Sequence, residues 1–91
     1  MNVLDRIIRL ILGERPRPRL TEAEVVAIAQ AVAEQEGWTW LEPALVSFIP
    51  GDRETPGHWE VVSNAHARGT NVRAYIDDAT GSVTGKGFLQ R

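Results

Sequence analysis

Two adjacent acidic residues, Asp77 and Asp78, are the first candidates for chemistry, and they lie in the stretch VRAYIDDATGSV. A pair of catalytic carboxylates is expected on separate elements that face a cleft. A calcium loop needs several more oxygen ligands at alternating offsets, and the sequence lacks them here. Aspartate, threonine and glycine are instead the residues that a chain reversal requires. We therefore expect both aspartates to form a turn, with Gly81 at a positive φ angle.

The stretch GSVTGKG, residues 81–87, partly matches a phosphate-binding loop. Such a loop has four residues between its glycines and a serine or threonine after its lysine. Here three residues separate Gly81 from Gly85, and Gly87 follows Lys86. Because strict alternation places Gly85 and Gly87 on an inward face, we interpret them as marks of a β-bulge or of close helix–sheet contact.

The histidines and serines complete the set of reactive side chains. His58 and His66 have no cysteine and no pair of carboxylates at ligand spacing to complete a metal site. Ser47, Ser63 and Ser82 lack the strand-turn-helix context of a nucleophilic serine. We expect surface or turn roles for all five, with no catalytic residue, no bound metal and no cofactor.

Trp38, Trp40 and Trp59 give the chain three tryptophans. An aromatic cage for a cation is built from such side chains. A small domain has a more general need for them, since burial of each ring contributes about 2–3 kcal/mol. We expect the tryptophans to pack in the core.

The length and the charge pattern limit the possible partners. A chain of 91 residues forms one domain with a single modest core. Residues 1–20 hold five arginines and two acids, a net charge of +3, whereas residues 21–42 hold five glutamates and no base, a net charge of -5. A nucleic-acid-binding protein presents a basic face on its folded body. We expect no nucleic-acid partner.

Residues 1–13 are predicted to form an amphipathic helix, and the Arg/Pro-rich residues 14–20 an extended spacer. The apolar arc spans about 200°. The run is interrupted by charges, so it does not resemble an export signal, and it is too short to span a bilayer. We expect a cytoplasmic protein whose helix docks on its own domain or pairs in a homodimer, in preference to a membrane surface. The docking residues are Val3, Leu4, Ile7, Ile8 and Ile11.

A second, longer helix is predicted over Glu22–Glu36. Thr21 and Glu24 have the spacing of a capping box, and Gly37 stands where a helix ends in a left-handed residue. Helical spacing places four apolar residues on one face: Val25, Ile28, Ala29 and Val32.

Four alternating segments follow, within WLEPALVSFI, HWEVVSNA, VRAYID and SVTGKGFL. Short connections rich in glycine, proline and asparagine separate them, which predicts an antiparallel four-strand meander. We therefore predict an α+β fold in which residues 21–91 pack a long helix on this meander.

Alternation also predicts two faces of the sheet. The face toward the long helix is assigned Trp59, Val61, Val72, Ala74, Ile76, Val83 and Leu89. The opposite face is assigned His58, Glu60, Val62, Arg73, Tyr75, Thr84, Lys86 and Phe88. Because this second face includes apolar side chains, we expect it to bind a partner or to receive the N-terminal helix. The predicted partner-binding residues are Glu60, Val62, Arg73, Tyr75, Lys86 and Phe88.

The segment LTEAEVVAIAQAVAEQEG resembles the opening helix of PepSY-type domains, and HWEVVSN with VRAYIDDATGSVTG resembles their closing strands. The resemblance covers residues 21–89. It rests on Trp59, Tyr75, Ile76, Asp77, Thr80, Gly81 and Val83. It implies a cystatin-like α+β unit that binds proteins without catalysis, often as an inhibitory or accessory segment. The helix and meander are also similar to nuclear-transport-factor-like folds found among small bacterial toxin-immunity proteins.

These observations favour a small, non-catalytic, intracellular protein-binding module, an inhibitor or an immunity protein. One alternative is a small hydrolase or lyase on a nuclear-transport-factor-like cone, with His58 or His66 paired to an aspartate. Another is a peripheral membrane module anchored by residues 1–12. A deep pocket with a histidine–aspartate contact favours the enzyme, and a filled core under a flat sheet favours the binding module.

Overall fold

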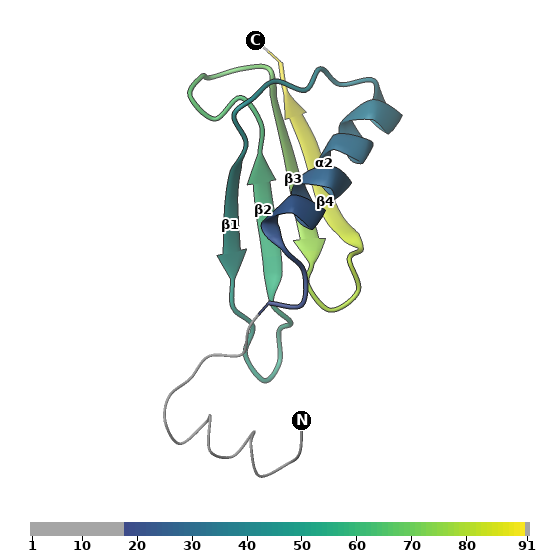
Figure 1. Ribbon diagram of the computed structural model, residues 1–91, viewed down its shortest axis with the longest axis vertical. Coiled ribbons are helices and arrows are strands. Elements are labelled where there is room, and N and C mark those ends of the chain that lie inside the picture. Colours follow the sequence, from purple (N-terminus) through teal and green to yellow (C-terminus); the bar gives the residue numbers. More distant parts are fainter. Residues whose placement is uncertain (1–17, 91) are drawn as a thin grey trace.

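The computed structural model describes residues 18–90, in which one helix packs on a four-stranded antiparallel sheet (Figure 1). The strands lie in the sheet in sequence order, so the predicted α+β class and meander are confirmed. The predicted N-terminal helix and residues 14–17 of the spacer lie outside the described residues. The elements are α2 (Glu22–Glu36), β1 (Leu45–Ile49), β2 (His58–Val62), β3 (Asn71–Asp77) and β4 (Val83–Leu89).

The ends of α2 are fixed by the signals that predicted them. The Thr21 side chain accepts a hydrogen bond from the Glu24 N–H at 3.2 Å, and the Glu24 carboxylate accepts one from the Thr21 N–H at 3.0 Å. Gly37 closes the helix with a φ of 75°, and the Trp38 N–H donates to the Ala33 carbonyl at 2.8 Å. These bonds satisfy backbone groups that a helix end leaves unpaired.

The core lies between α2 and the face of β2 and β3 that it covers (Figure 1). Ile76 is fully buried there, and Trp59 is 4% exposed and packs against Phe48 with ring centroids 4.9 Å apart. Ile28 of α2 packs against the same cluster. Ile28, Trp59 and Ile76 therefore share one core, which confirms the faces predicted for the helix and for β2 and β3. The other fully buried members of the cluster are Val25, Ala29, Val61 and Ala74.

The predicted faces of β4 are wrong over most of the strand, because a register shift lies opposite Tyr75 and Ile76. Ile76 pairs with Val83, whereas Tyr75 pairs with Gly85, so Thr84 is an extra residue in β4. An extra residue reverses the face of every side chain that follows it.

This bulge moves Lys86 and Phe88 to the helix side of the sheet, against the prediction. The Phe88 ring stacks on Trp38 with centroids 5.6 Å apart, and Lys86 forms an ion pair with Glu36 at the end of α2. Leu89 was predicted to face the helix, but it pairs with Asn71 and lies on the opposite face. Gly85 and Gly87 were also assigned to the helix side and lie on the opposite face.

Val83 keeps its predicted face, because it pairs with the buried Ile76 on the helix side of the sheet. It is nevertheless 37% exposed, because β4 is an edge strand. Val72 and Ala74 are fully buried, as predicted from alternation in β3. The alternation therefore holds up to the bulge.

The turn between β3 and β4 is built by Asp77. Its carboxylate accepts hydrogen bonds from the N–H groups of Ala79 at 2.8 Å and Thr80 at 3.1 Å. Gly81 has a φ of 76°, and its N–H donates to the Asp77 carbonyl at 2.8 Å. The predicted turn and the positive φ of Gly81 are confirmed.

Replacing Gly81 by valine is expected to lower the free energy of unfolding by more than about 1 kcal/mol. Space is not the reason, because the nearest atom to an added Cβ is Ile28 Cδ1 at 4.0 Å, an ordinary contact. The cost comes from a β-branched residue at positive φ. Urea unfolding measures it, and Gly81→Asn is the control because asparagine tolerates this conformation better. A valine variant as stable as the parent would contradict the backbone account.

Candidate functional site

The face of the sheet opposite α2 is uncovered within residues 18–90, and we call it the outer face (Figure 1). Its members follow from the strand register, which places directly paired residues on the same side. They are Leu45, Ser47, Ile49, His58, Glu60, Val62, Asn71, Arg73, Tyr75, Asp77, Gly85, Gly87 and Leu89.

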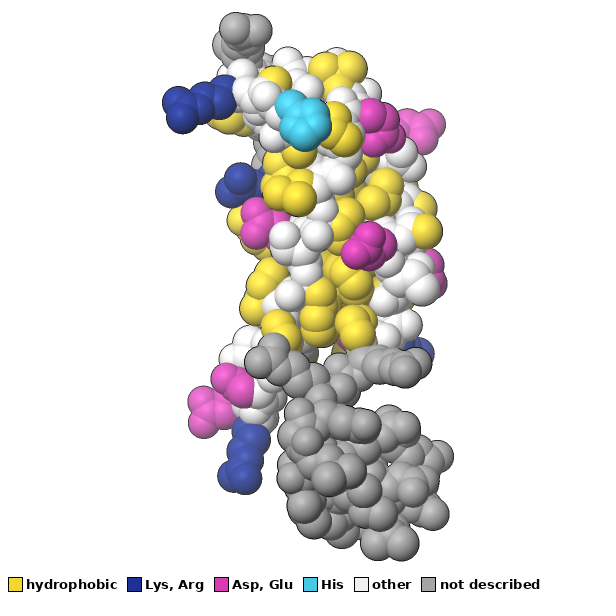
Figure 2. Space-filling model, turned by 60° about the vertical axis from the view of Figure 1, so that its left-hand side comes forward, with side chains coloured by type: hydrophobic (Ala, Val, Ile, Leu, Met, Phe, Trp, Pro, Cys, Tyr) yellow, Lys and Arg dark blue, Asp and Glu magenta, His cyan; other side chains and the backbone are white. Residues whose placement is uncertain are grey.

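Large apolar side chains lie exposed on the outer face. Leu45 is 59% exposed, Leu89 57% and Ile49 37%, while Val62 and Tyr75 are half-buried. Figure 2 brings the β1 side of the molecule forward and shows hydrophobic side chains along much of its length. Single exposed apolar residues are common, but a grouped set marks an interaction surface.

One ion pair lies among these apolar side chains. Arg73 Nε is 3.5 Å from Glu60 Oε1, and both side chains remain accessible to water. An exposed pair of this kind contributes only about 0–1 kcal/mol to folding. Its charges are available to orient a bound segment whose apolar side chains contact the surrounding surface.

A shallow groove of about 650 Å³ lies at one end of the outer face. Gly87 provides part of its floor, and a Cβ built on Gly87 meets no atom within 4 Å. The packing of the described residues therefore leaves room for a side chain at this position. We call this hollow the Gly87 groove; it is lined by Leu45, Val62, Ala65, Arg68, Arg73 and Leu89, among others.

The wall of the Gly87 groove is formed by the loop of residues 63–70, which Asn71 holds in place. The Asn71 Nδ2 group donates to the carbonyls of Ser63 at 2.8 Å and Asn64 at 3.0 Å, and its Oδ1 accepts from the Gly69 N–H at 2.7 Å. The buried Ser63 hydroxyl accepts from the Val72 N–H at 2.8 Å. The groove is thus preformed, and the sequence indicated only a polar loop.

A second hollow, of about 300 Å³, lies on the outer face near the β3–β4 turn and is lined by His58, Tyr75 and Asp77. His58 pairs with Asp77 in the strand register. The Asp77 carboxylate is occupied by the turn amides, and the structure records no hydrogen bond between the two side chains. His66 lies exposed on the loop of residues 63–70. This arrangement gives no support to the hydrolase or lyase alternative.

Gly85 has a local reason to be glycine, unlike Gly87. A Cβ at Gly85 would lie 3.1 Å from Tyr75 Cδ2, so the absence of a side chain lets the Tyr75 ring lie over β4.

Within the described part of the chain, no group of three or more histidine, cysteine or acidic residues could hold a metal ion.

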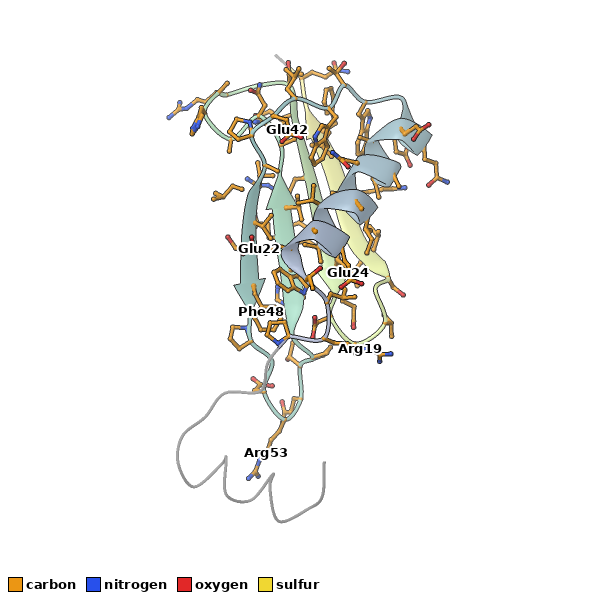
Figure 3. All side chains as sticks on the ribbon, in the orientation of Figure 1. Arg19, Glu22, Glu24, Glu42, Phe48 and Arg53 are labelled. Atoms are coloured by element: carbon orange, nitrogen blue, oxygen red, sulfur yellow. The ribbon has the colours of Figure 1, made fainter. Side chains whose placement is uncertain are left out.

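Asp78 lies in the turn, as predicted, but its carboxylate does not bond the turn amides as that of Asp77 does. Its carboxylate accepts three hydrogen bonds, from the N–H groups of Arg19 at 2.8 Å and Leu20 at 2.9 Å, and from Trp59 Nε1 at 2.9 Å. The Arg19 side chain also donates to the Ala79 carbonyl at 2.9 Å, at the end of the sheet (Figure 3). Asp78 therefore anchors the chain that enters α2 to this end of the sheet.

The environment of Asp78 favours its charged form. Partial burial alone raises its pKa, but the hydrogen bonds from Arg19, Leu20 and Trp59 and the positive charge of Arg19 outweigh this effect, so the pKa is lowered. No local sequence signal identifies the contact, since Arg19 and Asp78 are 59 residues apart.

The tryptophans have structural contacts. Trp59 is in the core, Trp38 stacks on Phe88, and Trp40 packs partly buried against the core while its Nε1 donates to Glu42 at 3.2 Å. They do not converge on a shared cage.

Four of the predicted partner-binding residues, Glu60, Val62, Arg73 and Tyr75, lie together on the outer face. Lys86 and Phe88 do not, because of the bulge. Sequence reasoning missed Gly87 and the exposed leucines at positions 45 and 89. Alternation in β1 was the signal that could have placed Leu45. The predicted docking residues Val3, Leu4, Ile7, Ile8 and Ile11 lie outside the described residues.

Comparison of the chain with protein-family models, curated proteins and solved structures gave no match. Among the described residues, no helix has the length and apolar character needed to cross a membrane.

Proposed function

We propose that this protein is a non-catalytic protein-binding module and that the outer face is its binding surface. The observation that carries the proposal is the contrast between the two faces of one sheet. The face under α2 is filled, with Val61 and Ile76 fully buried, whereas the outer face exposes Leu45 and Leu89 by more than half. An exposed apolar set on a preformed surface is typical of an interaction site.

The shape of the outer face favours a segment of another protein over a small molecule. Small-molecule sites enclose most of the ligand surface. The two hollows on the outer face are open and lie at its two ends, and the Glu60–Arg73 pair lines the Gly87 groove beside exposed leucines. An elongated segment that places apolar side chains and a polar group in the Gly87 groove matches this arrangement.

The resemblance to PepSY-type and cystatin-like domains supports the same proposal, since it implies a unit that acts by binding proteins. The observed helix over a four-stranded meander is compatible with that resemblance. In this proposal the module acts as an inhibitor or a toxin-immunity protein by occupying a surface of its partner.

The test begins with cross-linked capture from the native host and identification of the partner by mass spectrometry. The purified partner is then titrated calorimetrically against the full chain and against the double variant Leu45→Glu, Leu89→Glu. Both leucines are exposed, so the variant should keep its melting temperature within a few degrees. Its affinity should fall at least about tenfold, because each charge would be buried in the interface.

The matched control is Ala27→Glu, Ala31→Glu on the exposed side of α2. It adds the same charge and should change the affinity by less than about threefold. Equal affinities for the two double variants, or a larger loss in the α2 variant, would reject the outer face as the binding surface.

A further inference from the structure

Gly87 is a glycine in a strand interior that the packing of the described residues does not require. It is not among the residues at positive φ, and an added Cβ meets nothing within 4 Å. A glycine in such a position is less stable than an alanine, because it loses more backbone freedom on folding. Interior strand glycines often mark a place where another backbone approaches closely.

We propose that the apolar segment of residues 3–12 of this same chain occupies the outer face and covers the Gly87 groove. If the outer face binds a protein partner, as proposed above, that partner must displace this segment in order to bind. This consequence rests on the proposed function. The module is then autoinhibited by a covalently attached competitor.

The anchor at Asp78 places the start of the connecting chain at one end of the sheet. Arg19 and Leu20 are held there by the Asp78 carboxylate, beside the turn that borders the outer face. The five residues from 14 to 18 include two prolines and span about 15 Å when extended. This length exceeds the roughly 10 Å that separates a sheet from a layer packed on it.

The apolar segment also has the length that the outer face requires. The ten residues 3–12 extend about 15 Å in a helix. Arg73, which lines the Gly87 groove, lies four residues from Asp77 along β3, or about 13 Å. A helix that starts from the anchored end can therefore reach the groove along the strands.

Charge does not oppose this occupant. Residues 1–13 carry Arg6, Arg9 and Asp5, a net charge of +1. The outer face and the Gly87 groove carry Glu60, Asp77, Arg73 and Arg68, a net charge of zero with the histidine neutral. A short tether gives an effective concentration in the millimolar range, so even a weak contact would be well populated.

Disulfide trapping in the full chain tests the proposal, and the absence of native cysteines makes each introduced pair unambiguous. Ile8→Cys is combined in turn with Leu45→Cys, Val62→Cys or Leu89→Cys, and the control pair is Ile8→Cys with Ala31→Cys on the exposed side of α2. At low micromolar concentration, at least one outer-face pair should form an intramolecular disulfide about tenfold faster than the control pair.

Equal trapping rates, or faster trapping of the α2 pair, would overturn the proposal. Disulfide-linked dimers as the main product would overturn it in favour of a second copy. Strong flotation of the full chain with phosphatidylserine vesicles would overturn it in favour of a membrane surface. None of these measurements uses the protein partner. A failed trapping experiment is therefore distinguishable from a failure of the proposed function, which is tested by partner binding to the Leu45→Glu, Leu89→Glu variant.

Gly87→Val gives a second, independent test. The added side chain has room in the described structure and suits a strand, so the melting temperature should stay equal or rise. Because it fills the groove, it should slow trapping of the best outer-face pair at least about fivefold. Gln30→Leu, an exposed change on α2 outside the outer face, should leave the rate unchanged. Should valine unfold the protein, Gly87→Ala replaces it. Unchanged trapping in a folded Gly87 variant would contradict the proposal.

Discussion

Replacing Ile76 by alanine is expected to lower the free energy of unfolding by about 2–5 kcal/mol. Ile76 is fully buried under α2 and shares the central cluster with Trp59 and Val25. The substitution removes three carbon atoms from a packed site and leaves a cavity that neighbouring side chains fill only in part. A domain of this size has a small total stability, so the loss would be a large fraction of it.

Ile49→Ala is the matched control, since it makes the same change on the outer face, where Ile49 is 37% exposed. We expect a loss of less than about 1 kcal/mol there. Urea unfolding measures the free energy of unfolding of both variants, and the comparison holds when the slope of that free energy against urea concentration is the same in both. Equal losses, or a loss below about 0.5 kcal/mol for the Ile76 variant, would contradict the assignment of the two faces.

Replacing Asp78 by alanine is expected to cost about 2–3 kcal/mol, because the N–H of Leu20 and Nε1 of Trp59 lose their acceptor in a partly buried site. The exposed Arg19 N–H can exchange its bond for water. Asp77→Ala is the control: its two amide donors are exposed and regain water, so we expect less than about 1 kcal/mol. Urea unfolding at pH 7 should separate these two neighbouring acids. A larger loss for Asp77 would contradict the anchor role of Asp78.

The anchor also predicts a pH dependence of stability. The pKa of Asp78 is lowered in the folded state, so the folded state favours the carboxylate. Its contribution is fully present above the unfolded-state pKa of about 3.9 and is lost as the pH falls through the folded-state pKa. Asp78→Asn should therefore lose less stability than the parent between pH 5 and pH 2. A parallel loss in both proteins would contradict a stabilising role for the charge.

The parts of the fold that could be predicted have local causes. The capping box at Thr21 and the left-handed Gly37 fix α2 through contacts within a few residues. The turn at Asp77 is equally local. Alternation assigned β2 and β3 correctly because each buries one face under α2.

The errors come from features without a local signal. The bulge at Thr84 is followed by Gly85 and Gly87, and glycines carry no side chain that would reveal a change of face. The Asp78 anchor joins residues that are far apart in the sequence. For the candidate site, Glu60 and Val62 followed from alternation, and alternation in β1 could also have placed Leu45. Leu89 required the actual register, because it follows the bulge in β4.

The central claim is that the outer face binds a protein partner, and methyl NMR of the full chain titrated with the captured partner tests it most directly. The methyl groups of Leu45, Val62 and Leu89 report on the outer face, and those of Val26 and Leu41 report on accessible positions outside it. We predict that the largest shifts or losses of intensity occur at the first three residues. Changes concentrated at Val26 and Leu41, with the outer-face methyl signals unaltered, would contradict the account.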